Sequence, residues 1–268
     1  MTKSRRIELS RIICNDIADN GYDNGQSFVQ FSDNIYDVQI HEVKNWLDVK
    51  PFMTYDTKPG SVTVEDIDTI GAALKLAKDG AKVAILNFAS AWTPGGGWLK
   101  GTSAQEECLC YRSTLFASIA AATPHYADHH VQEYPYNPHR FLYTPNMIIY
   151  RNENGGAMPE PVKIGCFSCA AVDYRQLAKH PNLDRARGNE IMGERINAIL
   201  TAMNLMGYTH IVLGAWGCGV FKNFPQAIAG KFNEYLFTNP NTFKRIIFAV
   251  PNKDSENYQV FKRMIKDW

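Results

Sequence analysis

The sequence predicts a layered α/β fold with a largely internal sheet. From about residue 61 onward, apolar runs of strand length alternate with segments of helical periodicity, a pattern typical of layered α/β domains. The run 81–88 (AKVAILNF) is apolar almost throughout, as expected for a strand buried on both faces. Glycine-rich loops at 94–101 and 214–219 each follow such a strand, which places them where ligands bind in sheets of this class.

The first half of the chain is predicted to begin with an amphipathic helix that carries Leu9, Ile13 and Ile17 on one face. Its expected elements, in order, are a helix over 5–20, an irregular segment over 21–60 with extended pieces such as 51–55, a strand at 62–64, a helix over 65–78, a strand at 81–88 and a helix over 104–122.

The second half is predicted to start with a loop rich in Pro, His and Tyr. Its expected elements, in order, are a loop over 124–142, strands at 147–150 and 162–167 around a turn at 152–156, a helix over 190–206, a strand at 210–213, a helix over 224–237, a strand at 245–250 and a closing helix over 256–268.

Composition excludes several classes of protein. The chain has 268 residues, of which 45% are apolar and 21% charged, close to the average for globular domains. No window approaches the 18 or more apolar residues of a membrane span, and the first 20 residues lack the apolar core of a secretory signal. We therefore expect a cytoplasmic protein, or a nuclear one in a eukaryotic source, without a membrane partner. A formal net charge of +1 provides no broad field for nucleic acid, and sequence-specific nucleic-acid binding is not expected.

The cysteines indicate neither a disulfide framework nor a metal site. The pair at 166 and 169 has CxxC spacing, but no second pair follows and the segment is typical of a strand, whereas structural zinc needs four ligands. Histidines at 125, 129 and 130 would complete such a site only by coincidence of folding. We expect no metal, and reduced, buried, unreactive thiols at positions 14, 108, 110, 166, 169 and 218.

The second glycine loop fails the tests for two familiar nucleotide motifs. Its G-x4-G spacing is that of a phosphate loop, but Val220 and Phe221 occupy the Lys-Ser/Thr positions, and Lys222 replaces the third glycine of a dinucleotide fingerprint. A strand that leads through glycines into a helix with Asn223 as N-cap and Pro225 in its first turn can still bind phosphate through backbone N–H groups. A tight turn that uses glycine for steric reasons alone remains an equal alternative.

The first glycine loop carries a more specific pattern. Three consecutive glycines, Gly95-Gly96-Gly97, are followed after seven residues by Gln105-Glu106-Glu107 at the start of a predicted helix. Consecutive glycines cost ordering entropy, which favours a position where the backbone must approach something closely. Acidic residues in a first helical turn are common, so it is the combination that indicates a site.

These two motifs resemble the macrodomain fold and, within it, the poly(ADP-ribose) glycohydrolases of the shorter microbial type. The resemblance rests on GGG-x7-QEE and on the segment Gly217-Cys218-Gly219-Val220-Phe221-x-Asn223, and it covers roughly residues 50–260. It implies a three-layer macrodomain-like fold with a central mixed sheet flanked by helices and an N-terminal accessory helical segment. The expected division is an accessory helix and extended segment at 1–50 and a catalytic domain at 51–268, together one compact unit.

The resemblance also implies an activity: hydrolysis of the O-glycosidic ribose–ribose bonds of poly(ADP-ribose), with release of ADP-ribose and without a cofactor. Glu107 is then the general acid/base and Glu106 holds the ribose hydroxyls. Adjacent helical residues project about 100° apart, so one carboxyl must serve as acid and then as base around an oxocarbenium-like transition state. The helix N-terminus lowers the pKa of such a carboxyl, whereas burial and the neighbouring carboxylate raise it, and the sequence leaves both outcomes open.

The same resemblance assigns the substrate contacts. Asn87 is expected to contact the distal ribose, with a satisfied strand-end amide as the alternative, and Phe221 to cover the ribose and diphosphate, with a core aromatic as the alternative. Cys218 is expected to pack, because no base adjoins it. The remaining expected substrate-binding residues are Gly95, Gly96, Gly97, Gln105, Gly217, Gly219 and Val220, with Cys218 contributing backbone.

Three functions remain open from the sequence. Trp92 and Trp98 are bulkier than is usual around these glycines, and 166–174 lacks the usual small-Pro-Asn pattern, so the choice between polymer and single ADP-ribose groups is not determined. The alternatives are a hydrolase of mono-ADP-ribosylated protein or nucleic acid and a non-catalytic ADP-ribose reader. The intact glutamate pair argues against a reader. Each function requires that Glu107 and 217–221 face each other across one crevice.

Overall fold

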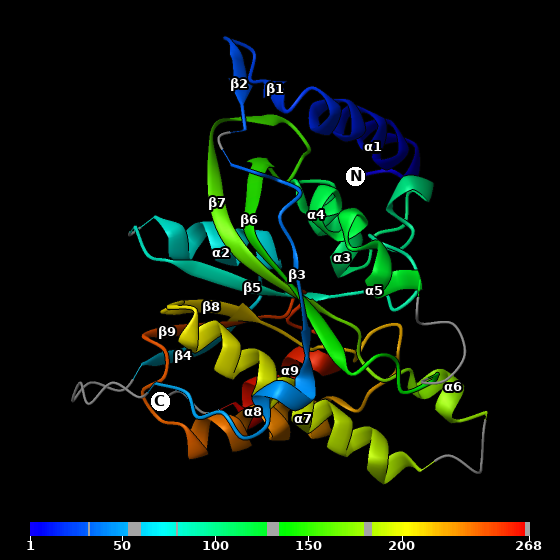
Figure 1. The fold of residues 1–268 in the computed structure, drawn as a ribbon, viewed down its shortest axis with the longest axis vertical. Helices are drawn as coiled ribbons and strands as arrows, with labels where there is room; N and C mark the ends of the chain where they lie inside the picture. Colours follow the sequence, from blue (N-terminus) through cyan, green and yellow to red (C-terminus); the bar gives the residue numbers. More distant parts are fainter. Residues whose placement is uncertain (32, 53–59, 79, 128–133, 180–183, 266–268) are drawn as a thin grey trace.

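The computed structural model describes the chain except for residues 32, 53–59, 79, 128–133, 180–183 and 266–268. Within the described part, the chain forms a mixed seven-stranded sheet between two layers of helices, and a small two-stranded sheet lies at one end (Figure 1). The predicted three-layer α/β architecture with a central mixed sheet is confirmed.

The main sheet has the strand order β3-β6-β7-β5-β8-β9-β4. Strands β7, β5, β8, β9 and β4 run parallel, and β6 is antiparallel to both β3 and β7. The bounds are β3 Gln39–Glu42, β4 Ser61–Glu65, β5 Val83–Phe88, β6 Arg140–Arg151, β7 Ala157–Cys169, β8 His210–Leu213 and β9 Arg245–Ala249, and the small sheet pairs β1 Gly21–Asp23 with β2 Phe28–Gln30.

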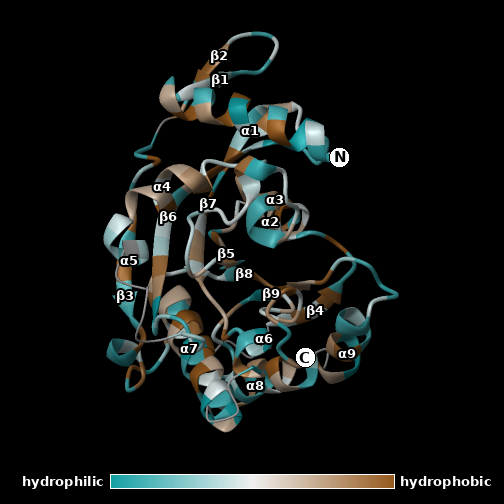
Figure 2. Cartoon of the chain, turned by 90° about the vertical axis from the view of Figure 1, so that its right-hand side faces the viewer, coloured by the Kyte–Doolittle hydropathy of each residue, from teal (hydrophilic) through white to brown (hydrophobic). Residues whose placement is uncertain are grey.

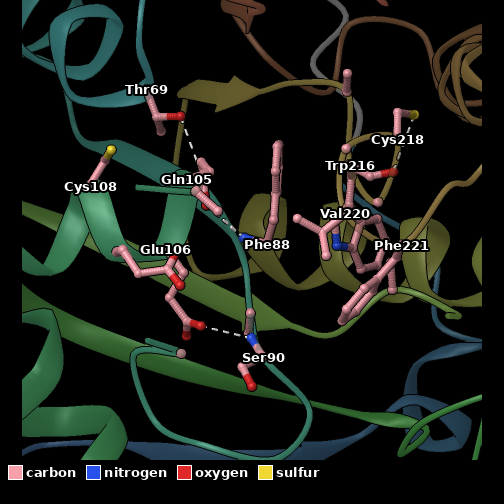
Figure 3. Close-up of a pocket in the computed structure, with 18 of the residues that line it drawn as sticks. Thr69, Phe88, Ser90, Gln105, Glu106, Cys108, Trp216, Cys218, Val220 and Phe221 are labelled. Atoms are coloured by element: carbon pink, nitrogen blue, oxygen red, sulfur yellow. Dashed lines mark hydrogen bonds between the residues drawn. The ribbon is translucent and has the colours of Figure 1, made fainter. Parts of the chain in front are cut away.

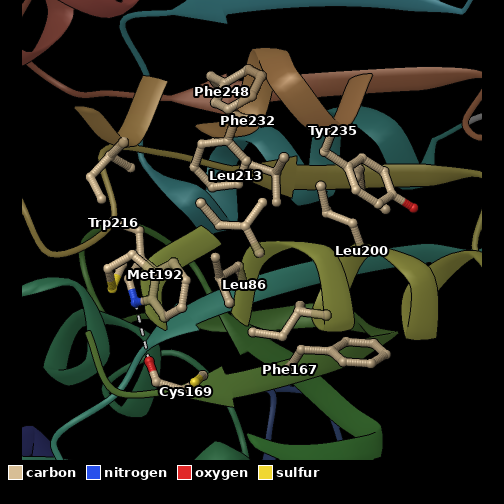
Figure 4. Packing of buried hydrophobic residues seen from close by; sticks show 14 of the residues in the cluster. Leu86, Phe167, Cys169, Met192, Leu200, Leu213, Trp216, Phe232, Tyr235 and Phe248 are labelled. Atoms are coloured by element: carbon tan, nitrogen blue, oxygen red, sulfur yellow. Dashed lines mark hydrogen bonds between the residues drawn. The ribbon is translucent and has the colours of Figure 1, made fainter. Parts of the chain in front are cut away.

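Alternating side chains of the central strand β5 pack into two separate hydrophobic cores, one on each face of the sheet. In β5, Val83 and Ile85 pack on the side of α1 to α4, whereas Ala84 and Leu86 pack on the side of α7, α8 and α9. Figure 4 shows the second core, where Leu86 lies with residues from the neighbouring strands and from helix α8. In Figure 2 helices α1 and α8 carry both colours, as expected for helices with one face toward the sheet.

The α-helices of the described residues agree with most of the predicted helical segments. Their bounds are α1 Lys3–Ala18, α2 Thr69–Ala77, α3 Gln105–Cys110, α4 Leu115–Ala121, α5 Thr123–Ala127, α6 Tyr174–Leu177, α7 Arg185–Leu205, α8 Pro225–Thr238 and α9 Glu256–Met264, and the two short 3-10 helices are η1 Val43–Trp46 and η2 Trp98–Lys100. None of these helices is long and apolar enough to cross a bilayer.

The prediction of one helix over 104–122 is wrong. The chain leaves the helix after Cys110, because Ser113 forms an isolated antiparallel bridge with Ile149 of β6 and the Thr114 amide donates to Ile148 O at 3.0 Å. This pairing across the fold divides the segment into α3 and α4. Cys108, within α3, is exposed.

Three other segments differ from their predictions. The described part of 21–60 is not irregular throughout, because it contains β1, β2, β3 and η1, whose short strands include polar and exposed residues. The extended piece expected at 51–55 lies partly outside the described residues. The predicted loop over 124–142 contains most of α5, and β6 begins at Arg140. The helix expected over 65–78 begins only at Thr69, because Asp68 is the N-cap and accepts from the Gly71 amide at 2.6 Å.

The first 50 residues contribute directly to the sheet and to one core. Leu9 and Ile13 of α1 are fully buried, and β3 is the edge strand of the main sheet. Arg6 Nε donates to Gly101 O at 2.8 Å, so α1 also contacts the end of the first glycine loop.

The cysteines are all free thiols, but the prediction that all are buried is wrong for Cys108, which is exposed, and for Cys14, which is half-buried. Among the residues that the structure describes, no cluster of three or more metal-ligating side chains occurs. His129 and His130 lie outside the described residues.

Strand order brings the two glycine loops together. Neighbours β5 and β8 run parallel, so the loops that follow them leave the same edge of the sheet. The chain continues from β5 toward β6 and β7 on one side and returns as β8 on the other, and this reversal of strand order creates a crevice beyond the strand ends.

Candidate active site

A cavity of about 1270 Å³ opens at this edge of the sheet (Figure 3). Its lining includes Gly96, Gly97, Glu106 and Glu107 from one side and residues 217–221 from the other. The expectation that the glutamates and the second glycine loop border one crevice is confirmed.

The first glycine loop has a backbone that only glycine adopts without strain. Gly95 and Gly96 have φ values of 71° and 58°. A Cβ atom at Gly96 would lie 2.6 Å from Oε1 of Glu107. The glycines therefore let the chain turn directly against the carboxylate.

Glu107 is held through one of its two carboxylate oxygens. Its Oε1 accepts from the Gly97 amide at 3.0 Å and from Thr102 Oγ1 at 2.9 Å. Within the described part of the chain, no donor contacts Oε2 of Glu107. The side chain is 8% exposed and lines the cavity. One oxygen thus fixes the carboxyl group and leaves the other without a partner among the described residues.

Glu106 is more deeply buried, at 3% exposure, and both of its oxygens accept hydrogen bonds. Oε2 accepts from the Ser90 amide at 2.8 Å and Oε1 from Asn87 Nδ2 at 3.2 Å. Burial, with a smaller contribution from the charge of Glu107, raises the pKa of Glu106 to about 8, against the lowering effect of these hydrogen bonds. The group can therefore change charge near neutral pH.

Asn87 lies behind Glu106 and not in the cavity. Its side chain is fully buried, and Nδ2 also donates to Ser168 Oγ of β7 at 3.0 Å. The sequence alternative of a satisfied strand-end amide describes this placement better than a direct ribose contact. Sequence reasoning missed Ser90 and Ser168, because only the pairing of β5 with β7 brings Ser168 next to Asn87.

Gln105 lines the cavity, but its amide group is used to join α3 to the end of β5. Its Oε1 accepts from the Phe88 amide at 2.9 Å, and its Nε2 donates to Leu86 O at 2.9 Å and to Thr69 Oγ1 at 3.2 Å. These bonds place the two following glutamates relative to the strand.

The second glycine loop presents backbone donors to the cavity. Gly217 has a φ of 76°, and a Cβ there would lie 2.6 Å from Ala171 Cβ. In the part of the chain that the structure describes, the N–H groups of Gly219, Val220 and Phe221 donate to no protein acceptor. Such a row of amides before a helix N-terminus binds phosphate groups.

Comparison with known families shows to which family the chain belongs. Residues 16–152 match the family described as microbial-type PARG, catalytic domain, which is just over half of the chain and includes the first glycine loop. The chain belongs to the microbial-type PARG family. It is therefore an enzyme of the glycohydrolase class. The second glycine loop lies outside this match, and no curated protein matches the chain.

Solved PARG structures match most of this chain. The poly(ADP-ribose) glycohydrolase of Thermomonospora curvata is 28% identical over 97% of this chain and 99% of its own, with a TM-score of 0.89. The same enzyme bound to the inhibitor ADP-HPD has a TM-score of 0.86 at 27% identity and the same coverage. The Deinococcus radiodurans enzyme in complex with ADP-ribose is 29% identical over 85% of this chain and 94% of its own, with a TM-score of 0.77.

The prediction that Asn223 is the N-cap of α8 is wrong. The N-cap is Phe224, and Asn223 Nδ2 instead donates to Val172 O at 2.8 Å and to Gly217 O at 3.1 Å. The side chain thus ties the second glycine loop to the loop after β7. The sequence motif GCGVF-x-N indicates this contact, because the asparagine comes directly after the loop that its side chain binds.

The side chains of Cys218 and Phe221, also in the second glycine loop, have different surroundings. Burial raises the pKa of the Cys218 thiol to about 12, and its Sγ contacts Trp216 O at 3.6 Å, consistent with a packing role. Figure 4 shows Trp216 donating to Cys169 O, a bond of 3.1 Å that anchors the loop base to β7. Phe221 lines the cavity and also packs against the core, and its contact with the ribose and diphosphate stays a prediction.

Proposed function

We propose that the protein hydrolyses the O-glycosidic ribose–ribose bonds of poly(ADP-ribose) and releases ADP-ribose. The observation that carries this proposal is the shared cavity of Glu107 and the amides of 217–221, in a chain of the microbial-type PARG family. Its structural relatives include glycohydrolases bound to ADP-ribose and to ADP-HPD.

The cavity accommodates the terminal ADP-ribose unit as follows. The N–H groups of Gly219, Val220 and Phe221 hold the diphosphate, with Gly217 and Cys218 shaping the turn, and the Phe221 ring covers the adjacent ribose. The ribose beside the scissile bond lies against Gly95–Gly97, and Glu106 accepts from its hydroxyls. Asn87 and Gln105 act through Glu106 and β5.

Glu107 is the general acid and then the general base. Its Oε2, which no donor of the described residues contacts, carries the proton to the leaving ribose oxygen as the bond from that oxygen to the anomeric carbon breaks. The positive charge that develops on the sugar is offset by the adjacent diphosphate. Water then attacks the anomeric carbon and gives its proton to the same carboxylate, which restores Glu107.

The segment 1–50 serves as an accessory layer of one compact unit with 51–268. Its contribution to the site is indirect: Arg6 binds the carbonyl of Gly101, which closes the first glycine loop. The six free thiols fit a reducing compartment, which supports a cytoplasmic or nuclear location. The partners are poly(ADP-ribose) and ADP-ribosylated macromolecules.

The test compares two substrates in one assay: automodified polymerase that carries polymer, and a protein that carries single ADP-ribose groups. The expected result is release of ADP-ribose from the polymer, with one unit left on each modified residue. Release from the mono-modified protein alone would instead identify a mono-ADP-ribosyl hydrolase. Binding of ADP-ribose without turnover of either substrate would identify a reader.

A further inference from the structure

One end of the cavity carries aromatic and cationic side chains that the terminal unit leaves unused. Trp92, Tyr134 and Arg175 all line the cavity, although they come from the loop after β5, the segment before β6 and helix α6. Trp92 and Tyr134 are half-buried, and their ring centroids lie 5.4 Å apart at an interplanar angle of 63°. Aromatic faces of this kind bind nucleobases by stacking.

Arg175 presents positive charge at the same place. Its Nε and Nη2 donate to Oδ1 and Oδ2 of Asp173 at 3.0 and 2.8 Å, and its guanidinium carbon lies 5.4 Å from the centroid of Phe221. The Asp173 side chain is 6% exposed and that of Arg175 is 41% exposed, so the cation is the accessible end of this pair. Nη1 of Arg175 donates to no acceptor among the described residues. A guanidinium placed in this way suits a phosphate group.

Trp92 is connected directly to the catalytic end of the cavity. Ser90 Oγ accepts from the amides of Trp92 and Thr93 at 3.2 and 3.1 Å, and the Ser90 amide is the donor that holds Glu106. In Figure 3 Ser90 lies next to Glu106, and Phe221 lies across the pocket from this pair. Because Glu106 and Phe221 border the scissile bond in the proposed function, this end is where the leaving group emerges.

The size of the cavity agrees with a second subsite. Its volume of about 1270 Å³ exceeds the roughly 300–1,000 Å³ of ordinary ligand pockets. We propose that Trp92, Tyr134 and Arg175 form a leaving-unit subsite, which binds the adenine and diphosphate of the second ADP-ribose unit. This inference rests on the proposed function, and it makes polymer the preferred substrate over single ADP-ribose groups.

The experiment uses two substrates that share the ribose–ribose bond. One is a purified two-unit fragment of poly(ADP-ribose), and the other is ADP-ribose linked to a ribose that lacks the second adenine and diphosphate. We expect Trp92→Ala to lower kcat/KM about tenfold on the two-unit fragment, mainly through KM, and less than twofold on the short substrate. Trp92→Phe keeps an aromatic face and should retain most of the preference for the two-unit fragment over the short substrate.

Arg175→Gln should lower kcat/KM on the two-unit fragment severalfold. Raised salt should lower the wild-type preference for the two-unit fragment over the short substrate. This salt effect should be smaller in Arg175→Gln, because a charged contact has been removed. Phe237→Ala and Arg5→Gln are the matched controls: both residues are exposed and lie outside the cavity lining, and neither variant should change the ratio between substrates. Thermal unfolding confirms that each variant is folded.

The outcomes separate the two proposals. If the wild-type protein hydrolyses neither substrate, the proposed function fails. If it hydrolyses both, but Trp92→Ala and Arg175→Gln change the two rates equally or leave both unchanged, the leaving-unit subsite is wrong and the proposed function stands.

Discussion

Nδ2 of Asn87 lies 3.2 Å from Oε1 of Glu106, and the same amide group contacts Ser168 Oγ at 3.0 Å. A side chain that the sequence suggested as a ribose contact therefore supports the Glu106 carboxyl group, which we propose as the ribose contact. The β5–β7 pairing provides the second anchor, so the position of Glu106 depends on two strands that are distant in sequence.

Removal of this support should affect both rate and pH dependence. Asn87→Ala deletes a donor to the buried carboxyl group of Glu106, and we expect kcat/KM to fall about tenfold, the effect of a buried acceptor that loses one hydrogen bond. Because this bond lowers the pKa of Glu106, that pKa should rise further in the variant. The measurement is a pH–rate profile, with Asn239→Ala at the end of α8 as control. A profile unchanged from wild type would contradict the supporting role.

The raised pKa of Glu106 also predicts how stability depends on pH. Its pKa is about 8 in the folded protein and 4.5 in its ordinary state, so between these values the folded chain retains a proton that the unfolded chain releases. The free energy of unfolding should therefore fall as pH rises from about 4.5 to 8, by at most about 1.4 kcal/mol per pH unit from this group.

Glu106→Gln removes this titration. The test compares how steeply the melting temperatures of the variant and of wild type change with pH. The melting temperature of the variant relative to wild type should increase from pH 5 to pH 8. Thermal unfolding in matched buffers measures this difference. Parallel curves for the two proteins would show that Glu106 does not titrate in this range.

Gly96 tests the contact between the first glycine loop and the carboxyl group of Glu107. In Gly96→Ala, the new Cβ meets Glu107 Oε1 at 2.6 Å, and we expect at least a tenfold loss of kcat together with a strain of about 1–2 kcal/mol from φ = 58°. Gly25→Ala is the control, because it has a φ of 88° but open space around it. Gly25→Ala should lose stability but keep the kcat of wild type. Equal loss of activity in both variants would contradict the argument.

Gly217 tests the proposed binding of diphosphate by the second glycine loop in the same way. Gly217→Ala drives a Cβ to within 2.6 Å of Ala171 and should weaken ADP-ribose binding about tenfold or more, as measured by calorimetry. Gly80→Ala shares a positive φ, of 69°, and has no neighbour within 4 Å, so its affinity should match that of wild type. Wild-type affinity in Gly217→Ala would remove this loop from the site.

The sequence predicted the elements whose patterns are local. Strand β8 begins and ends as predicted, because an apolar run between polar and glycine boundaries determines it, and the two glycine loops identify the edge where the cavity lies. Strand β3 was missed because its residues are polar or exposed, and it exists only through pairing with β6.

Other features depend on tertiary contacts that no local pattern reveals. The break between α3 and α4 arises from the bridge of Ser113 to Ile149. Arg195 occupies an ordinary helical position in the sequence, yet it is fully buried and donates to the carbonyls of Ala170 and Asn137 at 2.8 and 2.7 Å. It thereby holds the loop after β7, against which the second glycine loop packs.

The most direct test of the catalytic assignment is Glu107→Gln. The amide oxygen can still accept from Gly97 and Thr102, so the loop should keep its structure while the exchangeable proton is lost. We expect kcat for release of ADP-ribose from polymer to fall at least about 100-fold, the contribution of a general acid/base, with the Kd for ADP-ribose within about threefold of wild type. A kcat close to that of wild type would contradict the assignment of Glu107 as the acid/base.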